Sequence, residues 1–189
     1  MKERFIGLYH EHIRREGSAG LLDWMEKSDF FIAPASTRHH LSREGGLVEH
    51  SINVMERLQL LAEIESPNTS MESIAICGLL HDLCKTHYYT VEMRNVKEDG
   101  QWVQKPYYKV SDQLPYGHGE KSAYIIGGFM RLTREEAMAI RWHMGFSDES
   151  FKGGSSCISG AFEKYPLAVL LHIADLKATF LDEDRKEVA

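Results

Sequence analysis

The sequence predicts a mainly α-helical fold of six or seven helices with one β-hairpin. Apolar residues recur at spacings of three and four along most of the chain, as in helices that bury one face. Residues 88–110 differ, because they are rich in β-branched and aromatic side chains around an Asp99-Gly100 turn. The 189 residues, 43% of them hydrophobic, suffice for one domain with its own core. We expect a single domain over residues 1–189, with the hairpin inserted at 88–110.

The N-terminal segment, residues 1–36, is expected to form helices that pack on this domain. Residues 1–15 carry apolar side chains among charges, and a shorter helical stretch follows at 21–25. Pro34 interrupts the apolar residues 30–36, so this part is expected to be a loop that enters the core.

The clearest helical pattern follows the glycine pair at 45–46. Its apolar residues run from Leu47 to Leu61, and Pro67-Asn68 breaks the pattern. Ser70 is a suitable N-cap for the next helix, whose buried part is the apolar stretch 74–80.

Helices are expected to resume after the hairpin, at residues 118–130. Thr133 and Glu136 have the spacing of a capping box and predict another helix start. Residues 151–159 are rich in glycine and serine and are expected to form a loop. Proline suits the first turn of a helix, so the last helix is predicted from Pro166 to about Asp184.

The charge and the cysteines exclude several classes of protein. The net charge of −6 argues against a general binder of nucleic acid or anionic membranes, which needs clustered positive charge. Cys77, Cys84 and Cys157 form no CxxC pair, so neither a disulfide framework nor a zinc finger is indicated. The charged N-terminus has no apolar core of a signal peptide, and no window reaches a membrane span. We expect a cytoplasmic protein.

Histidine and aspartate stand where the predicted helices begin or end. His81 and Asp82 follow the apolar run 74–80, and Asp175 lies within another apolar stretch. Such polar groups are costly to bury unless they are paired or bound to a cation. A divalent metal would satisfy them together.

These residues carry a resemblance to the HD-domain superfamily of metal-dependent phosphohydrolases, which form helical bundles. Its ordered signature is a histidine, a His-Asp pair and a final aspartate, and members with two metals add two histidines before that aspartate. The phrases GGLVEHS and GLLHDLCK are typical of the superfamily, although Cys84 stands where glycine is common. The matching residues, in order, are His50, His81, Asp82, His118, His143 and Asp175. The pieces APAS, RHH and GHGEK also look like those of a bacterial or phage-borne branch of the superfamily.

The resemblance implies metal-activated hydrolysis of a phosphate ester. The first metal would be held by His50, His81, Asp82 and Asp175, and Asp82 would bridge to a second held by His118 and His143. Two such cations activate water and stabilise phosphoryl oxygens. We expect one or two divalent transition metals per chain, Fe, Mn, Ni or Zn rather than Mg, because imidazole predominates among the ligands.

Cationic side chains near the metals are candidates for substrate contacts. Lys85, one turn past the His-Asp pair, is predicted to act in catalysis with Asp82 and also to bind substrate. Lys121, His172 and Lys177 are predicted to bind substrate. Each lysine has a solvated surface charge as its alternative, and His172 has a core role. His118 could instead only cap a helix, and His143 could instead be an exposed histidine at a helix end.

The expected substrate is a small phosphorylated molecule, a nucleotide or a nucleic-acid end. We expect no membrane partner, and a homodimer remains open. Two other functions also remain open from the sequence. One is a di-iron oxygenase on the same scaffold, and the other is a nucleotide-sensing domain without turnover. Tyrosines of the hairpin could stack on a nucleobase, or they could serve ordinary strand packing.

Overall fold

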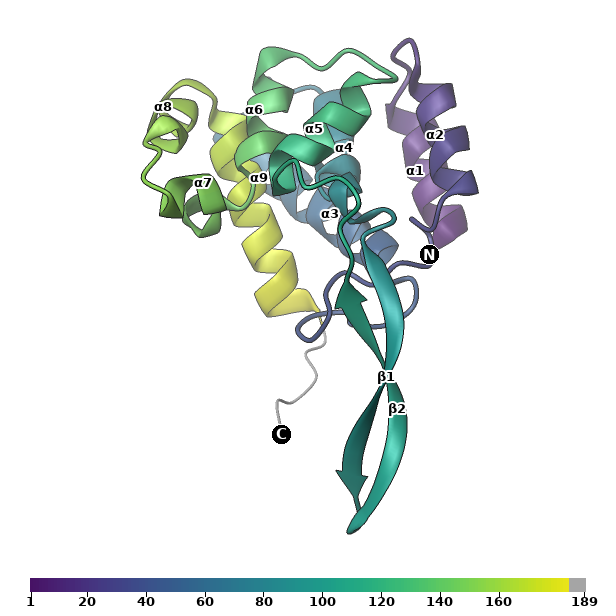
Figure 1. Ribbon diagram of the computed structural model, residues 1–189. Helices are drawn as coiled ribbons and strands as arrows, with labels where there is room; N and C mark the ends of the chain where they lie inside the picture. Colours follow the sequence, from purple (N-terminus) through teal and green to yellow (C-terminus); the bar gives the residue numbers. More distant parts are fainter. Residues whose placement is uncertain (184–189) are drawn as a thin grey trace.

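The computed structural model describes residues 1–183 and is mainly helical (Figure 1). Its α-helices are α1 (Lys2–His12), α2 (Ser18–Lys27), α3 (Gly46–Glu65), α4 (Met71–Leu80), α5 (His118–Gly127), α6 (Arg134–Trp142), α7 (Glu149–Lys152), α8 (Cys157–Lys164) and α9 (Pro166–Lys177). Three tighter or wider turns accompany them: the 3₁₀ turns η1 (Leu83–Lys85) and η2 (Gly145–Ser147) and the π-helical turn η3 (Ala178–Asp182). The prediction of a mainly helical fold with one hairpin is confirmed.

The core lies between α3, α4, α6 and α9. Helix α3 packs against α4 and α9, and α6 packs against α9 and α5. Every residue of α4 from Ile74 to Leu80 is buried, as its unbroken apolar run requires. Gly78 permits the closest approach of α4 to α3, because a Cβ at this position would lie 2.4 Å from the Cα of Met55. His81 and Asp82, at the end of α4, are therefore brought into the interior.

The N-terminal segment is fastened to the helical body by apolar and ionic contacts. Phe5 and Tyr9 of α1 are fully buried beside Phe30 of the following loop. The Arg15 guanidinium donates to both carboxylate oxygens of Glu136 on α6, at 2.5 and 2.9 Å. These contacts hold the N-terminal segment against the helical body. Among the described residues, no helix combines the length and the hydropathy of a membrane-spanning segment.

Two details of the C-terminal third differ from the sequence prediction. Residues 151–159 were expected to be a loop, but α7 overlaps their beginning and α8 begins at Cys157. The Asp148 side chain caps the start of α7. Helix α8 is stabilised because Ile158 and Ala161 pack against Trp142. Helix α9 ends at Lys177 and the chain continues in η3, which is followed by extended backbone at Glu183, so the predicted helix to Asp184 is wrong at its end. Asp184 itself lies outside the described residues.

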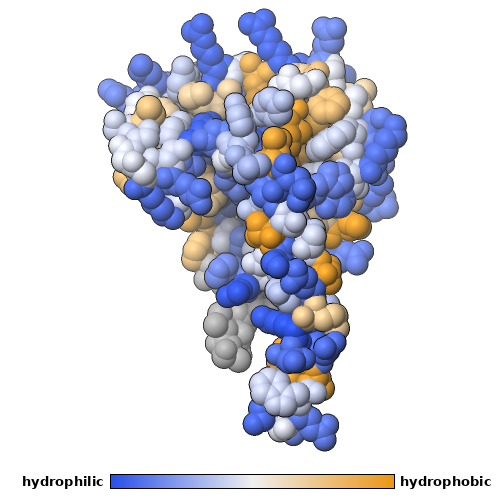
Figure 2. Space-filling model, in the orientation of Figure 1, coloured by the Kyte–Doolittle hydropathy of each residue, from blue (hydrophilic) through white to orange (hydrophobic). Residues whose placement is uncertain are grey.

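The inserted hairpin is an antiparallel pair of ten-residue strands, β1 (Tyr89–Glu98) and β2 (Gln101–Val110). Asp99 and Gly100 both have positive φ, of 48° and 82°, which fits a two-residue hairpin turn. The strands project from the helical body as an arm (Figure 1). Hydrophilic and hydrophobic side chains both lie along it (Figure 2), and the exposed apolar ones include Val91, Met93 and Trp102.

Candidate metal centre

The six predicted ligands come from five helices and meet at one end of the bundle core. His50 lies on α3, His81 and Asp82 end α4, His118 begins α5, His143 follows α6, and Asp175 lies on α9. All except His81 line a cavity of about 410 Å³, and His81 is fully buried behind it. Residues up to 125 positions apart in the sequence, His50 and Asp175, are thus neighbours.

The first group consists of four donor atoms, and three of them surround the fourth, Nε2 of His50. This atom lies 3.3 Å from Nε2 of His81, 3.3 Å from Oδ1 of Asp175 and 3.6 Å from Oδ2 of Asp82. His81 Nε2 also lies 3.6 Å from Asp82 Oδ2. Donors about 2.1 Å from a common cation would be roughly 3.0–3.4 Å apart, so this spacing fits one metal ion.

Outer hydrogen bonds fix which nitrogen of each histidine faces the group. His81 Nδ1 donates to the carbonyl oxygen of Gly78 at 2.9 Å, and His50 Nδ1 donates to the Glu183 carboxylate at 2.9 Å. Because both oxygens can only accept, the hydrogen sits on Nδ1 in each ring. In the neutral form of each ring the Nε2 lone pair therefore faces the other ring, an arrangement that a cation stabilises.

A second group surrounds the other oxygen of Asp82. Oδ1 lies 2.8 Å from Nε2 of His118 and 3.6 Å from Nε2 of His143. His143 Nδ1 donates to the Ile140 carbonyl at 2.7 Å, so its Nε2 carries a lone pair. This Nε2 is buried and has no hydrogen-bond partner among the described residues. Such an orphaned acceptor is costly in a folded protein and is explained by a cation beside Asp82.

The turn η1 places two more side chains at this centre. The Lys85 ammonium lies 2.5 Å from Asp82 Oδ2. Cys84 Sγ lies 3.4 Å from His118 Nδ1 and 3.9 Å from Asp82 Oδ1. Lys85 lines the cavity at the first group, whereas Cys84 faces a neighbouring cavity of about 630 Å³ beside His118.

The environment holds the first group in the protonation states that a metal requires, with one exception. Burial lowers the pKa of His81 to about 3, so its ring is neutral. Burial raises the pKa of Asp82, but the charge of Lys85 and contacts with the histidines outweigh burial and hold it well below its usual value. Burial lowers the pKa of His50, but the carboxylates of Asp175 and Glu183 outweigh it and raise the pKa to about 9. A cation would replace the proton of His50.

His118 shows the same competition between burial and negative neighbours. Burial lowers its pKa, but the Cys84 sulfur and the Asp82 carboxylate outweigh burial and raise the pKa to about 10. Burial raises the pKa of Asp175, but the hydrogen bond from His50 and the charge of that ring outweigh burial and lower it. Both shifts come from the close pairing of an imidazole with an anionic group.

The predicted substrate residues lie at different distances from this centre. His172 lines the main cavity and donates from Nδ1 to the His143 carbonyl at 2.7 Å, which supports the backbone of a predicted ligand. The Lys121 ammonium is paired with Asp112 at 2.5 Å and lies over the Tyr88 ring, at the neighbouring cavity. Lys177, at the end of α9, lies outside the lining of both cavities.

Two polar residues of the centre were not singled out as site residues from the sequence. Glu183 accepts from His50 and, at 3.1 Å, from the Asn53 amide. The centroid of the His40 ring lies 4.9 Å from that of His50, with the ring planes tilted by 43°. Burial together with the charge of His50 lowers the pKa of His40 to about 4. His40 Nε2 and Glu183 Oε2, 3.9 Å apart, are both buried without a hydrogen-bond partner in residues 1–183. The histidine pair at 39–40 was a signal for His40, but no motif pointed to Glu183.

Comparison with known proteins gives one match. The family model of the HD domain matches residues 47–178, more than two-thirds of the chain, and this range contains all six predicted ligands. No curated protein and no solved structure matches the chain significantly.

Proposed function

The chain belongs to the HD domain family, and from this premise we propose that it is a metal-dependent phosphohydrolase acting on a nucleotide or a nucleic-acid end. The observation that most supports the proposal is the position of Asp82 between two groups of donor atoms. Its Oδ2 faces His50 and His81, and its Oδ1 faces His118 and His143. When bound, two divalent cations supply Lewis acidity that activates water and stabilises charge on phosphoryl oxygens.

The donor atoms fit such cations by number and by type. From the pairwise distances around the two oxygens of Asp82, one site is proposed at His50, His81, Asp82 and Asp175, and the other at Asp82, His118 and His143. Imidazole nitrogens outnumber carboxylates, which favours Fe, Mn, Ni or Zn over Mg. Asp82 therefore has the largest predicted effect, because it belongs to both sites.

Lys85 is proposed to contact the phosphate of the substrate. Its ammonium lines the main cavity next to Asp82 and carries donors suited to a phosphate oxygen. The side chain is only 12% exposed, so its charge acts in a setting with little water to screen it. His172 lies on the wall of the same cavity and is proposed as a second substrate contact.

The shape of the cavity supports a nucleotide-sized substrate. Its volume of about 410 Å³ falls within the range of small-molecule sites. Tyr88 and Tyr89, at the base of the hairpin, and Phe180 contribute aromatic surface next to the polar residues. Aromatic faces stack on any nucleobase, so this surface suits a nucleotide without selecting a particular base.

The experiment compares Asp82→Ala with Asp23→Ala, a change of an exposed aspartate on α2. Both proteins are stripped with chelator and reloaded with Mn, Fe, Ni, Zn or Mg. Release of phosphate or nucleotide is then measured from nucleotides, cyclic dinucleotides and short single-stranded RNA and DNA. We expect metal-dependent turnover in wild type and Asp23→Ala and none in Asp82→Ala. Equal activity of the two variants would contradict the proposal, and turnover that consumes dioxygen would favour the oxygenase alternative.

A further inference from the structure

Cys84 is held rigidly at the second group of donor atoms. It lies in η1, directly after the His81-Asp82 pair, and its backbone N–H donates to Ser122 Oγ at 3.0 Å. Ser122 is fully buried on α5, which also supplies His118. The hydrogen bond joins η1 to α5, so the cysteine and this histidine are fixed relative to each other.

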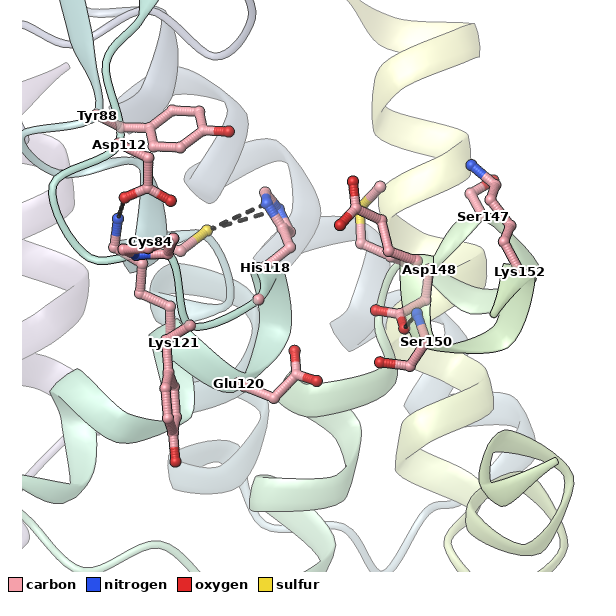
Figure 3. Close-up of a pocket in the computed structure, with 15 residues that line it drawn as sticks. Cys84, Tyr88, Asp112, His118, Glu120, Lys121, Ser147, Asp148, Ser150 and Lys152 are labelled. Atoms are coloured by element: carbon pink, nitrogen blue, oxygen red, sulfur yellow. Dashed lines mark hydrogen bonds and ion pairs between the residues drawn. The ribbon is translucent and has the colours of Figure 1, made fainter. Parts of the chain in front are cut away.

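The sulfur lies at ligand spacing from two donors of the second site. Figure 3 shows Cys84 and His118 directed toward each other at the cavity wall. Sγ lies 3.4 and 3.6 Å from the two ring nitrogens of His118 and 3.9 Å from Asp82 Oδ1. Tetrahedral zinc, with bonds of about 2.3 Å to sulfur and 2.0–2.1 Å to nitrogen, would place these atoms roughly 3.6 Å apart.

An independent observation indicates a cation at this place. His143 Nε2, 3.6 Å from Asp82 Oδ1, is buried and lacks a hydrogen-bond partner in the described part of the chain. Its side chain is 1% exposed, and its hydrogen is committed to the Ile140 carbonyl. Two groups, Asp82 with Cys84 and His118 and Asp82 with His81 and His143, each have all donor atoms within 4.8 Å of one another.

We propose that Cys84 supplies a thiolate ligand to the second metal site, beside Asp82, His118 and His143, and that this site takes a thiophilic divalent cation of the zinc type. The proposal rests on the metal centre of the proposed function and adds a ligand and a selectivity to it. On binding, a sulfur–metal bond replaces the S–H bond, and the proton leaves to solvent through the adjoining cavity.

The consequence is a centre with two unlike sites. The site at His50, His81, Asp82 and Asp175 offers only nitrogen and oxygen, whereas the second offers sulfur as well. Thiolate favours zinc over the harder manganese and magnesium ions. We therefore expect the second site to discriminate among metals more strongly than the first.

Cobalt(II) tests the proposal, because a thiolate bound to it gives a sulfur-to-cobalt charge-transfer band in the near ultraviolet. The metal-free wild type, Cys84→Ser and Cys157→Ser are titrated with cobalt, and bound metal is counted alongside the spectrum. Cys157 is an exposed cysteine on α8 and serves as the matched control. We expect the band in wild type and Cys157→Ser and its loss in Cys84→Ser. Zinc affinity at the second site should fall at least about tenfold in Cys84→Ser, the lower limit found for outer-shell partners of metal sites.

Each other outcome is decisive. Two bound cobalt ions without the band, or a band that persists in Cys84→Ser, would overturn the thiolate ligand and leave the proposed function intact. A folded wild type that binds no cobalt would overturn both. Circular dichroism and a second variant, Cys84→Ala, show whether loss of the band reflects the lost sulfur or a loss of folding.

Discussion

Glu183 Oε1 accepts a hydrogen bond from Nδ1 of His50 at 2.9 Å, across 133 positions of the sequence. The contact orients the imidazole so that Nε2 faces His81 and Asp175. Carboxylates that orient metal-binding histidines in this way typically contribute 10–100-fold to metal affinity.

Glu183→Ala should therefore weaken metal binding by about 10–100-fold. Glu183→Gln should have a smaller effect, because its amide oxygen can still accept from His50. Competition with a chromophoric chelator measures the affinity, and Glu65→Ala, an exposed glutamate on the helix of His50, is the control. An unchanged affinity in Glu183→Ala would show that the contact does not prepare His50 for a metal.

His118→Ala separates the two proposed sites. His118 lies beside Oδ1 of Asp82 and belongs to no group with His50, so its loss should remove the second metal and retain the first. Turnover should fall by at least about 100-fold, the scale of removing one group that stabilises a transition state. Metal content and rate are compared with His10→Ala, an exposed histidine of α1. A variant that keeps both metals would refute the assignment of His118.

Glu136 should stabilise the fold without affecting the metals. Its buried carboxylate accepts from Arg15 and, at 2.8 Å each, from Ser73 Oγ and the Thr133 backbone. Glu136→Gln breaks a buried ion pair on one side, which typically costs about 3–5 kcal/mol. Urea unfolding measures the loss against Glu163→Gln, an exposed position on α8. A loss equal to that of the control, or a change in metal content, would contradict this role.

The same carboxylate should make stability depend on acid pH. Burial raises the pKa of Glu136, but hydrogen bonds from Arg15, Thr133 and Ser73 outweigh burial and lower it below 4.5. A group with a lowered folded-state pKa stabilises the protein above its unfolded pKa, and this stability is lost as the pH falls through the folded value. Below pH 4.5, the free energy of unfolding should therefore fall more steeply in wild type than in Glu136→Gln. Parallel curves would contradict the assignment.

The distal part of the hairpin should be dispensable for the metal centre. The cavity is lined by Tyr89 and Val110 at the base of the arm, and neither cavity beside the centre is lined by residues 95–104. Replacing 95–104 with Asn-Gly keeps the Arg94–Lys105 pair next to a two-residue turn. Metal content and turnover of a small substrate should remain at the wild-type level, and a loss of either would show that the arm reaches the site.

Sedimentation of the trimmed protein also tests the homodimer left open by the sequence. A wild-type dimer that becomes a monomer on trimming would assign the interface to the arm, whose exposed face includes Val91, Met93 and Trp102. An unchanged mass would assign it no such role.

The helices could be predicted because local signals determine them. Ser70 caps α4, and Thr133 and Glu136 form the capping box of α6, as their spacing indicated. The apolar run of α4 is buried along its whole length, so the residues that directly follow it, His81 and Asp82, also lie in the interior.

The contribution of Glu183 could not be predicted, because it depends on how the chain leaves α9. The π-helical turn at 178–182 and the ion pair between Arg57 and Asp182 return the chain to α3, and both depend on tertiary contacts. Cys84 stands two positions after Asp82 in the sequence. Only the fold shows that its sulfur meets His118.

The most direct measurement is anomalous diffraction from crystals loaded with manganese or zinc, because it locates each metal relative to Asp82. We expect two peaks, one among His50, His81, Asp82 and Asp175 and the other at Oδ1 of Asp82, beside His118 and His143. With zinc, the second peak should also contact Cys84. Folded protein without a peak next to Asp82, at metal concentrations that support turnover, would contradict the proposed metal centre.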